Sequence, residues 1–319
     1  TPYICDRVHA LVDPGLALPQ GMMAEAKRAL IRSLTEKRGA APERKTARVS
    51  PPAEGARRSG SCALIFETLL PEQLTPELAA LRPDYLYVPA DIIASESARL
   101  EPFIREGVPV AAVLPRVIHD RELTQTASLL RSVRALGVTE AVCANLGHVA
   151  LARLAGMDAR GDYGLNIFNS YALELARTAS LRSATASFEL SLEQIAALTM
   201  PLDVEVIAYG RLPVMLTEKC LIKQSSGRCT CSTPGRLSDE QGGVMAVLRE
   251  GGCRNAVYSA HKVFLADRAG ELGRAGVWGM RLLFTNESAR ECVEVAKSFL
   301  GESRYRPNGA TRGLYMKGV

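Results

Sequence analysis

The sequence lacks a long apolar run, since no stretch reaches the roughly 20 residues that a helix needs to cross a bilayer. Its first residues also lack a basic start followed by an apolar block, so no secretory signal is visible. We therefore expect a cytoplasmic protein without a membrane partner. Because the chain begins with Thr1 rather than Met, we interpret it as a piece of a longer protein.

Recognisable catalytic signatures are equally scarce. The chain has 4 histidines, none of them in an HExxH pattern, and it has no GxSxG elbow and no Walker-type phosphate loop. Nothing in the sequence therefore points to a zinc-peptidase helix, a serine-hydrolase elbow or a P-loop. A catalytic triad stays open, because its members meet only in the fold.

The excess of basic over acidic side chains is also small. The 319 residues include 39 basic and 34 acidic side chains, which gives a formal net charge of +5, and hydrophobic residues make up 47%. This composition is ordinary for a globular protein. The mild basic excess permits a polyanionic partner such as RNA without requiring one.

Three parts of the chain are expected. Residues 17–38 place apolar side chains such as Met22, Leu30 and Leu34 at helical spacing, which predicts an amphipathic helix within residues 1–38. Residues 39–60 are basic, contain Pro, Gly and Ser, and show no apolar periodicity, which is typical of a flexible linker. Residues 61–319 form the main domain.

From residue 61 onward, strand-length apolar runs alternate with helical patterns. Eight strands, each followed by a helix, predict an α/β fold of the (β/α)8 TIM-type barrel class. An open doubly wound sheet is the alternative, but it would favour a Gly-rich first turn, which this sequence lacks. The expected strands are 62–68, 84–88, 108–114, 140–144, 159–168, 183–189, 203–207 and 277–284, and the expected helices lie near 75–81, 92–105, 121–136, 148–155, 170–178, 191–198, 239–250 and 286–300.

Polar side chains follow the predicted strands at their carboxyl ends, where a TIM-type barrel has its active site. Each of them alone is typical of a helix cap or a turn, but together they predict a polar barrel mouth. The candidate catalytic residues are Arg116, Asn145, Asn166, Glu189 and Arg211, accompanied by Glu67, Asp91, Asn169 and Tyr209.

Four of the 8 cysteines fall in a predicted insertion, residues 211–256, between the last two strands. Their order is Cys220-x8-Cys229-x-Cys231-x21-Cys253, in a stretch rich in Gly, Ser, Thr and Lys. Four converging thiolates suit tetrahedral zinc or an iron–sulfur cluster, although the spacing lacks the two CxxC knuckles of a zinc ribbon. We predict a metal site with these four cysteines as ligands, and free thiols in a loop are the alternative.

Two segments, GDYGLNIFNS (161–170) and VEVIAYGRLPVMLTEKC (204–220), resemble the peptidase U32 family, which is named for collagenase-like proteases. The helix of residues 17–38 resembles the end of a middle domain that follows a first U32 barrel in a longer bacterial subgroup. The tail GATRGLYMKGV (309–319) resembles the closing segment of the family. The resemblance implies that residues 1–38 are a remnant of a preceding domain, and that the chain packs against a missing N-terminal barrel.

The better understood relatives implied by this resemblance are iron–sulfur proteins. Some hydroxylate bases of tRNA or 23S ribosomal RNA, and others take part in oxygen-independent ubiquinone hydroxylation; four cysteines hold a [4Fe–4S] cluster. The family pattern matches Cys220, Cys229 and Cys253, whereas Cys231 has no clear counterpart. The sequence departs from the pattern in its longer first gap and in a blurred Asp-Arg motif between the cysteines.

Three functions follow as hypotheses. The first is iron–sulfur-dependent hydroxylation of an RNA base, in which Arg304, Arg306, Arg312 and Lys317 of the tail bind phosphates. The second is hydrolysis of peptides, as the family name implies, in which a bound metal or a polar mouth residue activates water. Zinc is the alternative to the iron–sulfur cluster at the cysteines. The third is a barrel with a degraded cofactor site, which binds RNA or the partner barrel without catalysis.

Overall fold

The computed structural model describes residues 3–4, 6–7, 9, 11–17, 19–42, 52, 60–230, 233–240 and 242–318. The chain forms two compact units, Thr1–Ser50 and Pro51–Val319. In the first unit, the helix expected over residues 17–38 is confirmed as α1 (Gln20–Gly39), which buries none of its side chains. Most of the predicted linker, residues 43–51 and 53–59, lies outside the described residues.

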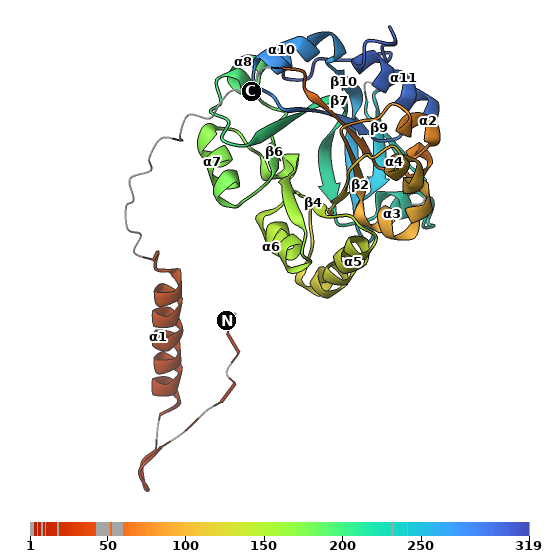
Figure 1. The fold of residues 1–319 in the computed structure, drawn as a ribbon. Coiled ribbons are helices and arrows are strands. Elements are labelled where there is room, and N and C mark those ends of the chain that lie inside the picture. Colours follow the sequence, from red (N-terminus) through yellow and green to blue (C-terminus); the bar gives the residue numbers. More distant parts are fainter. Residues whose placement is uncertain are drawn as a thin grey trace. The chain divides into compact units, whose positions relative to one another are not determined.

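In the second unit, eight parallel strands close into a barrel that helices surround (Figure 1). Strand β11 pairs with both β1 and β7, which closes the ring and confirms the predicted (β/α)8 TIM-type fold. The barrel strands are β1 (Ala63–Thr68), β2 (Tyr85–Pro89), β3 (Val110–Val113), β4 (Glu140–Cys143), β5 (Asp158–Gly161), β6 (Ser183–Thr185), β7 (Asp203–Thr217) and β11 (Gly279–Phe284).

The helices of this unit bury an apolar face against the barrel, and several begin at a side-chain cap. Ser288, for example, accepts a hydrogen bond from Glu291 N at the start of α11, which buries Val295 and Ala296. Among the described helices, none combines the length and the apolar composition that crossing a bilayer requires. The helices are α2 (Pro76–Ala79), α3 (Ala90–Ser95), α4 (Glu101–Arg105), α5 (Leu123–Ala135), α6 (Leu146–Leu154), α7 (Ser170–Thr178), α8 (Leu192–Ala196), α10 (Ala269–Arg274) and α11 (Ala289–Phe299).

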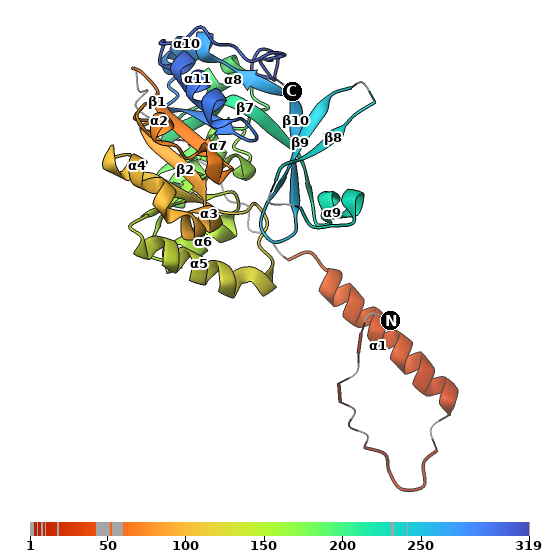
Figure 2. The same cartoon turned by 90° about the vertical axis from the view of Figure 1, so that its right-hand side faces the viewer.

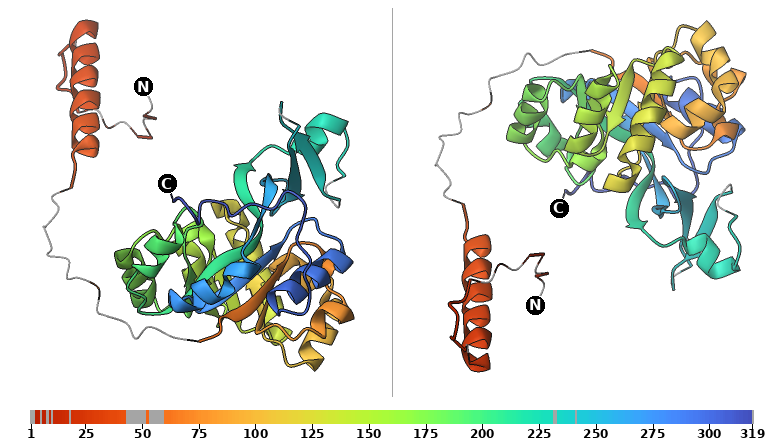
Figure 3. Two further views of the ribbon diagram at one scale, coloured as in Figure 1. Left: turned by 90° about the horizontal axis from the view of Figure 1, so that it is seen from above. Right: turned by 90° about the horizontal axis from the view of Figure 1, so that it is seen from below.

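A small antiparallel sheet stands out from the barrel on the extended second half of β7 (Figure 2, Figure 3). β7 leaves β11 at Gly210, where φ is 128° and an added Cβ would lie 2.3 Å from the carbonyl oxygen of Leu283. Only glycine fits this bend, and beyond it β7 pairs with β10. The insertion of residues 211–256 contains α9 (Leu221–Ser226), β8 (Gly235–Ser238), β9 (Val244–Arg249) and the start of β10 (Asn255–Phe264).

The helix predicted over residues 239–250 is wrong. Its apolar part is strand β9, which lies between β8 and β10 in the small sheet. Glycine pairs on both sides, at 242–243 and 251–252, leave a run of strand length that is too short for a stable helix. Periodicity alone could not separate the two structures, and pairing with neighbouring strands decided between them.

Candidate functional site

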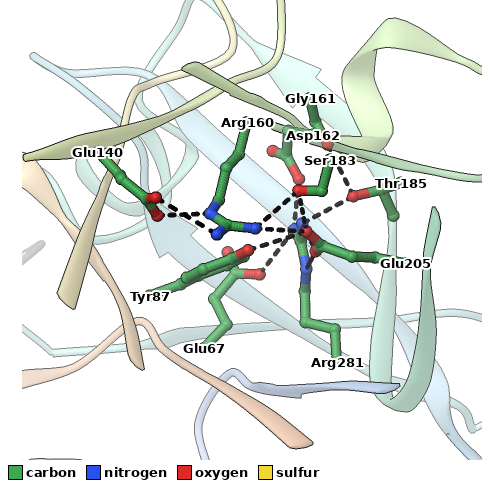
Figure 4. A network of polar contacts seen from close by, with 10 residues as sticks. All are labelled: Glu67, Tyr87, Glu140, Arg160, Gly161, Asp162, Ser183, Thr185, Glu205 and Arg281. Atoms are coloured by element: carbon green, nitrogen blue, oxygen red, sulfur yellow. Dashed lines mark hydrogen bonds and ion pairs between the residues drawn. The ribbon is translucent and has the colours of Figure 1, made fainter. Parts of the chain in front are cut away.

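The interior of the barrel carries charged side chains at inward-facing strand positions. Arg281 has no exposed surface, and its neighbours in β11, Met280 and Leu282, belong to the apolar core between the barrel and the helices. Successive side chains of a strand point to opposite faces, so Arg281 points into the barrel. Figure 4 shows its guanidinium surrounded by polar side chains from several strands.

Three buried carboxylates surround this guanidinium. Arg281 Nη1 donates to Glu67 Oε2 at 3.1 Å and to Asp162 Oδ1 at 2.5 Å. Nη2 donates to Glu205 Oε2 at 2.7 Å and to Thr185 Oγ1 at 2.7 Å. Because three carboxylates face one cation, the cluster is short of positive charge when all of its groups are ionised.

A second buried arginine extends the network toward the other end of the barrel (Figure 4). Arg160 donates to Glu140 Oε2 at 2.5 Å and to Ser183 Oγ at 3.0 Å, and its Nη1 lies 3.8 Å from Glu205 Oε1. Its guanidinium also lies over the ring of Tyr85, 4.1 Å from the centroid. Buried ion pairs of this kind are costly to desolvate, so they point to a role beyond stability.

Two carboxyl groups of this network have raised pKa values. Burial raises the pKa of Glu67 to about 7; Arg281 opposes the increase and the neighbouring Asp162 adds to it. The pKa of Asp162 is also raised, chiefly by burial. Glu67 therefore gains and loses its proton near neutral pH, which is the range in which a general acid or base operates.

A cavity of about 600 Å³ has Glu67 and Asp162 among its lining residues. Its walls include residues 69–72, 89–92 and 113–116, which follow the carboxyl ends of β1, β2 and β3. The aromatic side chains of Tyr163 and Tyr258 also line it. A TIM-type barrel has its active site at this end, so the buried acid and the cavity coincide where catalysis is expected.

The insertion forms a further wall of the cavity through residues 233–234 and 248–252. Three ion pairs join it to loops that follow β2 and β3. In one of them, Arg116 makes a two-pronged contact with Glu250, with Nη2 to Oε2 at 2.8 Å and Nε to Oε1 at 3.1 Å. The other two pairs are Arg254 with Glu122 at 3.0 Å and Arg249 with Asp91 at 2.7 Å. These contacts hold the insertion over the barrel mouth.

Two of the five predicted catalytic residues line cavities. Arg116 lines the mouth cavity, where the contact with Glu250 occupies its guanidinium. Arg211 lines a second cavity of about 570 Å³ beside the start of α11 and donates through Nη1 to the carbonyl oxygens of Ser259 and Ala260. The mouth residues Glu67 and Asp91 also line the first cavity.

The other three predicted catalytic residues line neither cavity. Asn145 caps α6 by accepting a hydrogen bond from Gly147 N at 2.8 Å. Asn166 ends a short 3₁₀ turn in the left-handed region, with φ at 48°. Glu189 is partly buried in the loop before α8. Asn145 and Asn166 thus have the capping and turn geometry that is common for asparagine.

The sequence analysis missed Asp162, Glu205 and Arg281. Glu205 and Arg281 each interrupt an apolar strand, DVEVIAY and GMRLLF, at inward-facing positions, and that interruption was a usable signal. Asp162 was missed because the fifth strand was expected to run to residue 168. The strand ends at Gly161, so Asp162 is the first residue beyond it.

The three described cysteines of the predicted metal site lie on the insertion. Cys220 is partly buried at the start of α9, where its Sγ accepts a hydrogen bond from Lys223 N at 3.4 Å, while Cys229 and Cys253 are exposed. Cys231 lies outside the described residues. Within the described part of the chain, no three His, Cys, Asp or Glu side chains are placed to hold a metal ion. The three described cysteines alone do not form such a group, and the ligand set, which includes Cys231, stays a prediction.

The basic residues predicted to bind RNA differ in their surroundings. Arg312 pairs with Asp267 and donates to the carbonyl oxygen of Phe264 at 2.8 Å, so it anchors the tail to the barrel. Arg304, Arg306 and Lys317 are exposed. The assignment of these four residues to RNA binding stays a prediction.

Comparison with known proteins gives one family and several solved structures. The model of peptidase family U32 matches residues 100–276, which is more than half of the chain. No curated protein matches the sequence. A solved U32 peptidase is 13% identical, with 54% of this chain and 75% of that chain covered and a TM-score of 0.35. Deoxyribose phosphate aldolase from Aeropyrum pernix is 14% identical, with 74% and 89% covered and a TM-score of 0.39.

Proposed function

This chain belongs to peptidase family U32, and from that premise we propose that the mouth cavity is its active site and that Glu67 is the group that transfers protons there. The observation that carries the proposal is a buried carboxyl group with a pKa near 7 on the wall of a cavity at the carboxyl ends of the barrel strands. Perturbed acids in clefts are the usual mark of a catalytic acid or base.

The reaction that fits the family name is hydrolysis of a peptide bond. In its ionised form Glu67 accepts a proton from a water molecule, whose oxygen adds to the carbonyl carbon of the substrate. The carbon–nitrogen bond then breaks, and the proton passes from Glu67 to the leaving amine. Arg281 donates to Glu67 Oε2 at 3.1 Å, which holds the carboxylate in place and stabilises its charged form.

The first test is the pH dependence of this acid. With Glu67 as the base, kcat/KM for a quenched fluorescent peptide should fall with the ionised fraction of Glu67 as the pH drops below about 7, and it should level off above that value. An NMR titration of the protein with ¹³C-labelled glutamate carboxyl groups should show one resonance with the same midpoint. That resonance should be missing in Glu67→Gln. A profile without an inflection near neutrality would contradict the assignment.

A second candidate function is iron–sulfur-dependent hydroxylation of an RNA base, and we propose it on the position of the cysteines. Cys220, Cys229 and Cys253 all lie on the insertion that forms a wall of the cavity. Cys253 lies between Gly252 and Arg254, which both line the cavity that a flipped base would enter. In this candidate the exposed Arg304, Arg306 and Lys317 would contact the RNA backbone.

Purification of the protein without oxygen tests this second candidate function. We expect protein purified without oxygen to contain iron and acid-labile sulfide in cluster stoichiometry, with a broad visible absorption that Cys253→Ser abolishes. The matched control is Cys62→Ser, because Cys62 lies outside the insertion and its Sγ only donates to the carbonyl oxygen of Val277. Iron that is absent, or equal in both variants, would eliminate the cluster and with it this function.

A further inference from the structure

The mouth cavity is electronegative, although the chain as a whole is basic. Beyond the residues of the three ion pairs, the described lining includes four carboxyl groups, those of Glu67, Glu72, Glu96 and Asp162, and no further lysine or arginine. The whole chain, in contrast, has a formal net charge of +5. The negative charge of the cavity lining is thus a local property, and its sign is opposite to that of the net charge of the protein.

The cations of the cavity wall are already engaged. Arg116, Arg249 and Arg254 each contact a carboxylate at 3.0 Å or less. Arg281, behind the wall, is shared by three carboxylates. An entering phosphate would therefore have to compete with carboxylates for every one of these guanidinium groups. Glu96 pairs with Arg99 at 3.2 Å. An entering cation would therefore meet the charge of Glu72 and the part of the inner cluster that one guanidinium, shared by three carboxylates, leaves uncompensated.

The carboxyl groups of the cavity differ in depth. Glu72 is exposed at the rim. Glu67 and Asp162 are buried at the inner end, and both have raised pKa values, which a nearby cation would lower again. A positively charged ligand that reaches Glu67 would therefore stabilise the ionised form of the carboxyl group that the proposed reaction needs.

The remaining walls suit an organic cation on an aliphatic chain. Leu69, Leu114 and Leu248 offer apolar surface for a methylene stem, and the ring of Tyr258 can receive a cationic head. The ring of Tyr163 already has the Arg116 guanidinium over it, 5.9 Å from the centroid. A metal ion fits less well, because no three acidic, His or Cys side chains among the described residues are placed to hold one.

One donor in the wall also lacks an acceptor. Arg254 is 5% exposed, and its Nε has no hydrogen-bond partner although its Nη1 donates to Glu122. An unpaired buried donor is unfavourable, and because Arg254 lines the cavity, the carbonyl oxygen of a bound chain would satisfy it once the side chain turns toward the cavity. A ligand that offers both a cation and carbonyl groups meets both requirements, and a peptide with a basic side chain is such a ligand.

We propose that the mouth cavity selects peptides that present a lysine or arginine side chain to its carboxylates. This inference rests on the proposed function, since it names the substrate class of the same site. Binding and cleavage are nevertheless separate measurements, so the two ideas can fail independently.

The test is equilibrium binding to the full chain, followed by fluorescence anisotropy. The probes are labelled alanine-rich peptides with a single central lysine, norleucine or glutamate. We expect the lysine peptide to bind at least about tenfold more tightly than the norleucine peptide at low salt, and the advantage to shrink as salt is added. Glu72→Gln should weaken only the lysine peptide, whereas Glu77→Gln, an exposed acid of α2 outside the cavity lining, should not.

Each outcome decides one idea. Equal binding of the lysine and norleucine peptides, or displacement of the lysine peptide by a short RNA oligonucleotide at lower concentration than by unlabelled peptide, would overturn the inference. Selective binding without cleavage of any peptide would leave the inference in place and remove the hydrolytic function. Cleavage without preference for a basic residue would remove the inference and leave the hydrolytic function in place.

Discussion

Arg281→Met should destabilise the barrel by about 3–5 kcal/mol at pH 8, because it removes the cation from a cluster of buried carboxylates. Methionine fills much of the volume of arginine, so the loss would come mainly from charge and hydrogen bonding rather than from a cavity. Glu67, Asp162 and Glu205 would all lose a hydrogen bond from the guanidinium. Urea unfolding can be followed by the fluorescence of the single tryptophan, Trp278, which packs against Tyr85.

The loss of stability in Arg281→Met should increase as the pH rises. Arg281 lowers the pKa of Glu67 and of Asp162 against the effect of burial, so without it both values rise further above 4.5 and 3.8, their ordinary values. A carboxyl group whose pKa is raised by folding contributes stability below its unfolded pKa and loses it as the pH rises through its folded pKa. The deficit of the variant should therefore be largest at pH 8 and smaller at pH 5.

Two further variants separate charge from general damage. Adding Glu205→Gln to Arg281→Met removes a buried carboxylate that has lost its hydrogen bonds from Arg281, so it should recover part of the stability at pH 8. Arg182→Met is the matched surface control, because Arg182 pairs with Asp158 in solvent and surface pairs contribute little. A deficit of the same size at both pH values, or an equal loss in Arg182→Met, would argue that the network is not held together electrostatically.

Glu67→Gln is expected to lower kcat/KM by about 10² to 10⁴-fold, the usual contribution of a general base, while the protein stays folded. The glutamine oxygen can still accept the hydrogen bond from Arg281 Nη1, so the geometry is kept and only the titratable group is lost. Removing one of three carboxylates around one guanidinium should leave the stability at pH 8 equal or higher. The two substitutions in this network thus have opposite expected effects on stability.

The comparison with Glu77→Gln completes this experiment. Glu77 is an exposed acid outside the cavity lining, and its change should leave kcat/KM and the unfolding midpoint as they are. Hydrolysis in Glu67→Gln at the wild-type rate, with circular dichroism and unfolding unchanged, would remove Glu67 from the reaction. It would then favour a barrel that binds without catalysing.

The predicted strands and helices show which elements of the fold sequence patterns are sufficient to locate. Each of the eight expected barrel strands overlaps an observed one, because parallel barrel strands are short apolar runs that recur with helices between them. The helix predicted over residues 239–250 was wrong because a run of five apolar residues, 244–248, suits either a helix or a strand, and the strands that pair with it, β8 and β10, are separate segments of the chain. Glu67 was included among the mouth residues because it lies one residue before the end of a strand, whereas the placement of Asp162 depended on where the fifth strand stops.

The sequence by itself determined the fold class, the family and the end of the barrel at which polar side chains gather. These depend on local periodicity and on short segments, both of which are read along the chain. Only the tertiary structure decided which of those polar residues share a site. Glu67, Asp162, Glu205 and Arg281 are up to 214 positions apart, and closure of the barrel brings them within hydrogen-bond distance. Burial at that meeting point then raises the pKa of Glu67, a property that depends on surroundings and not on spacing.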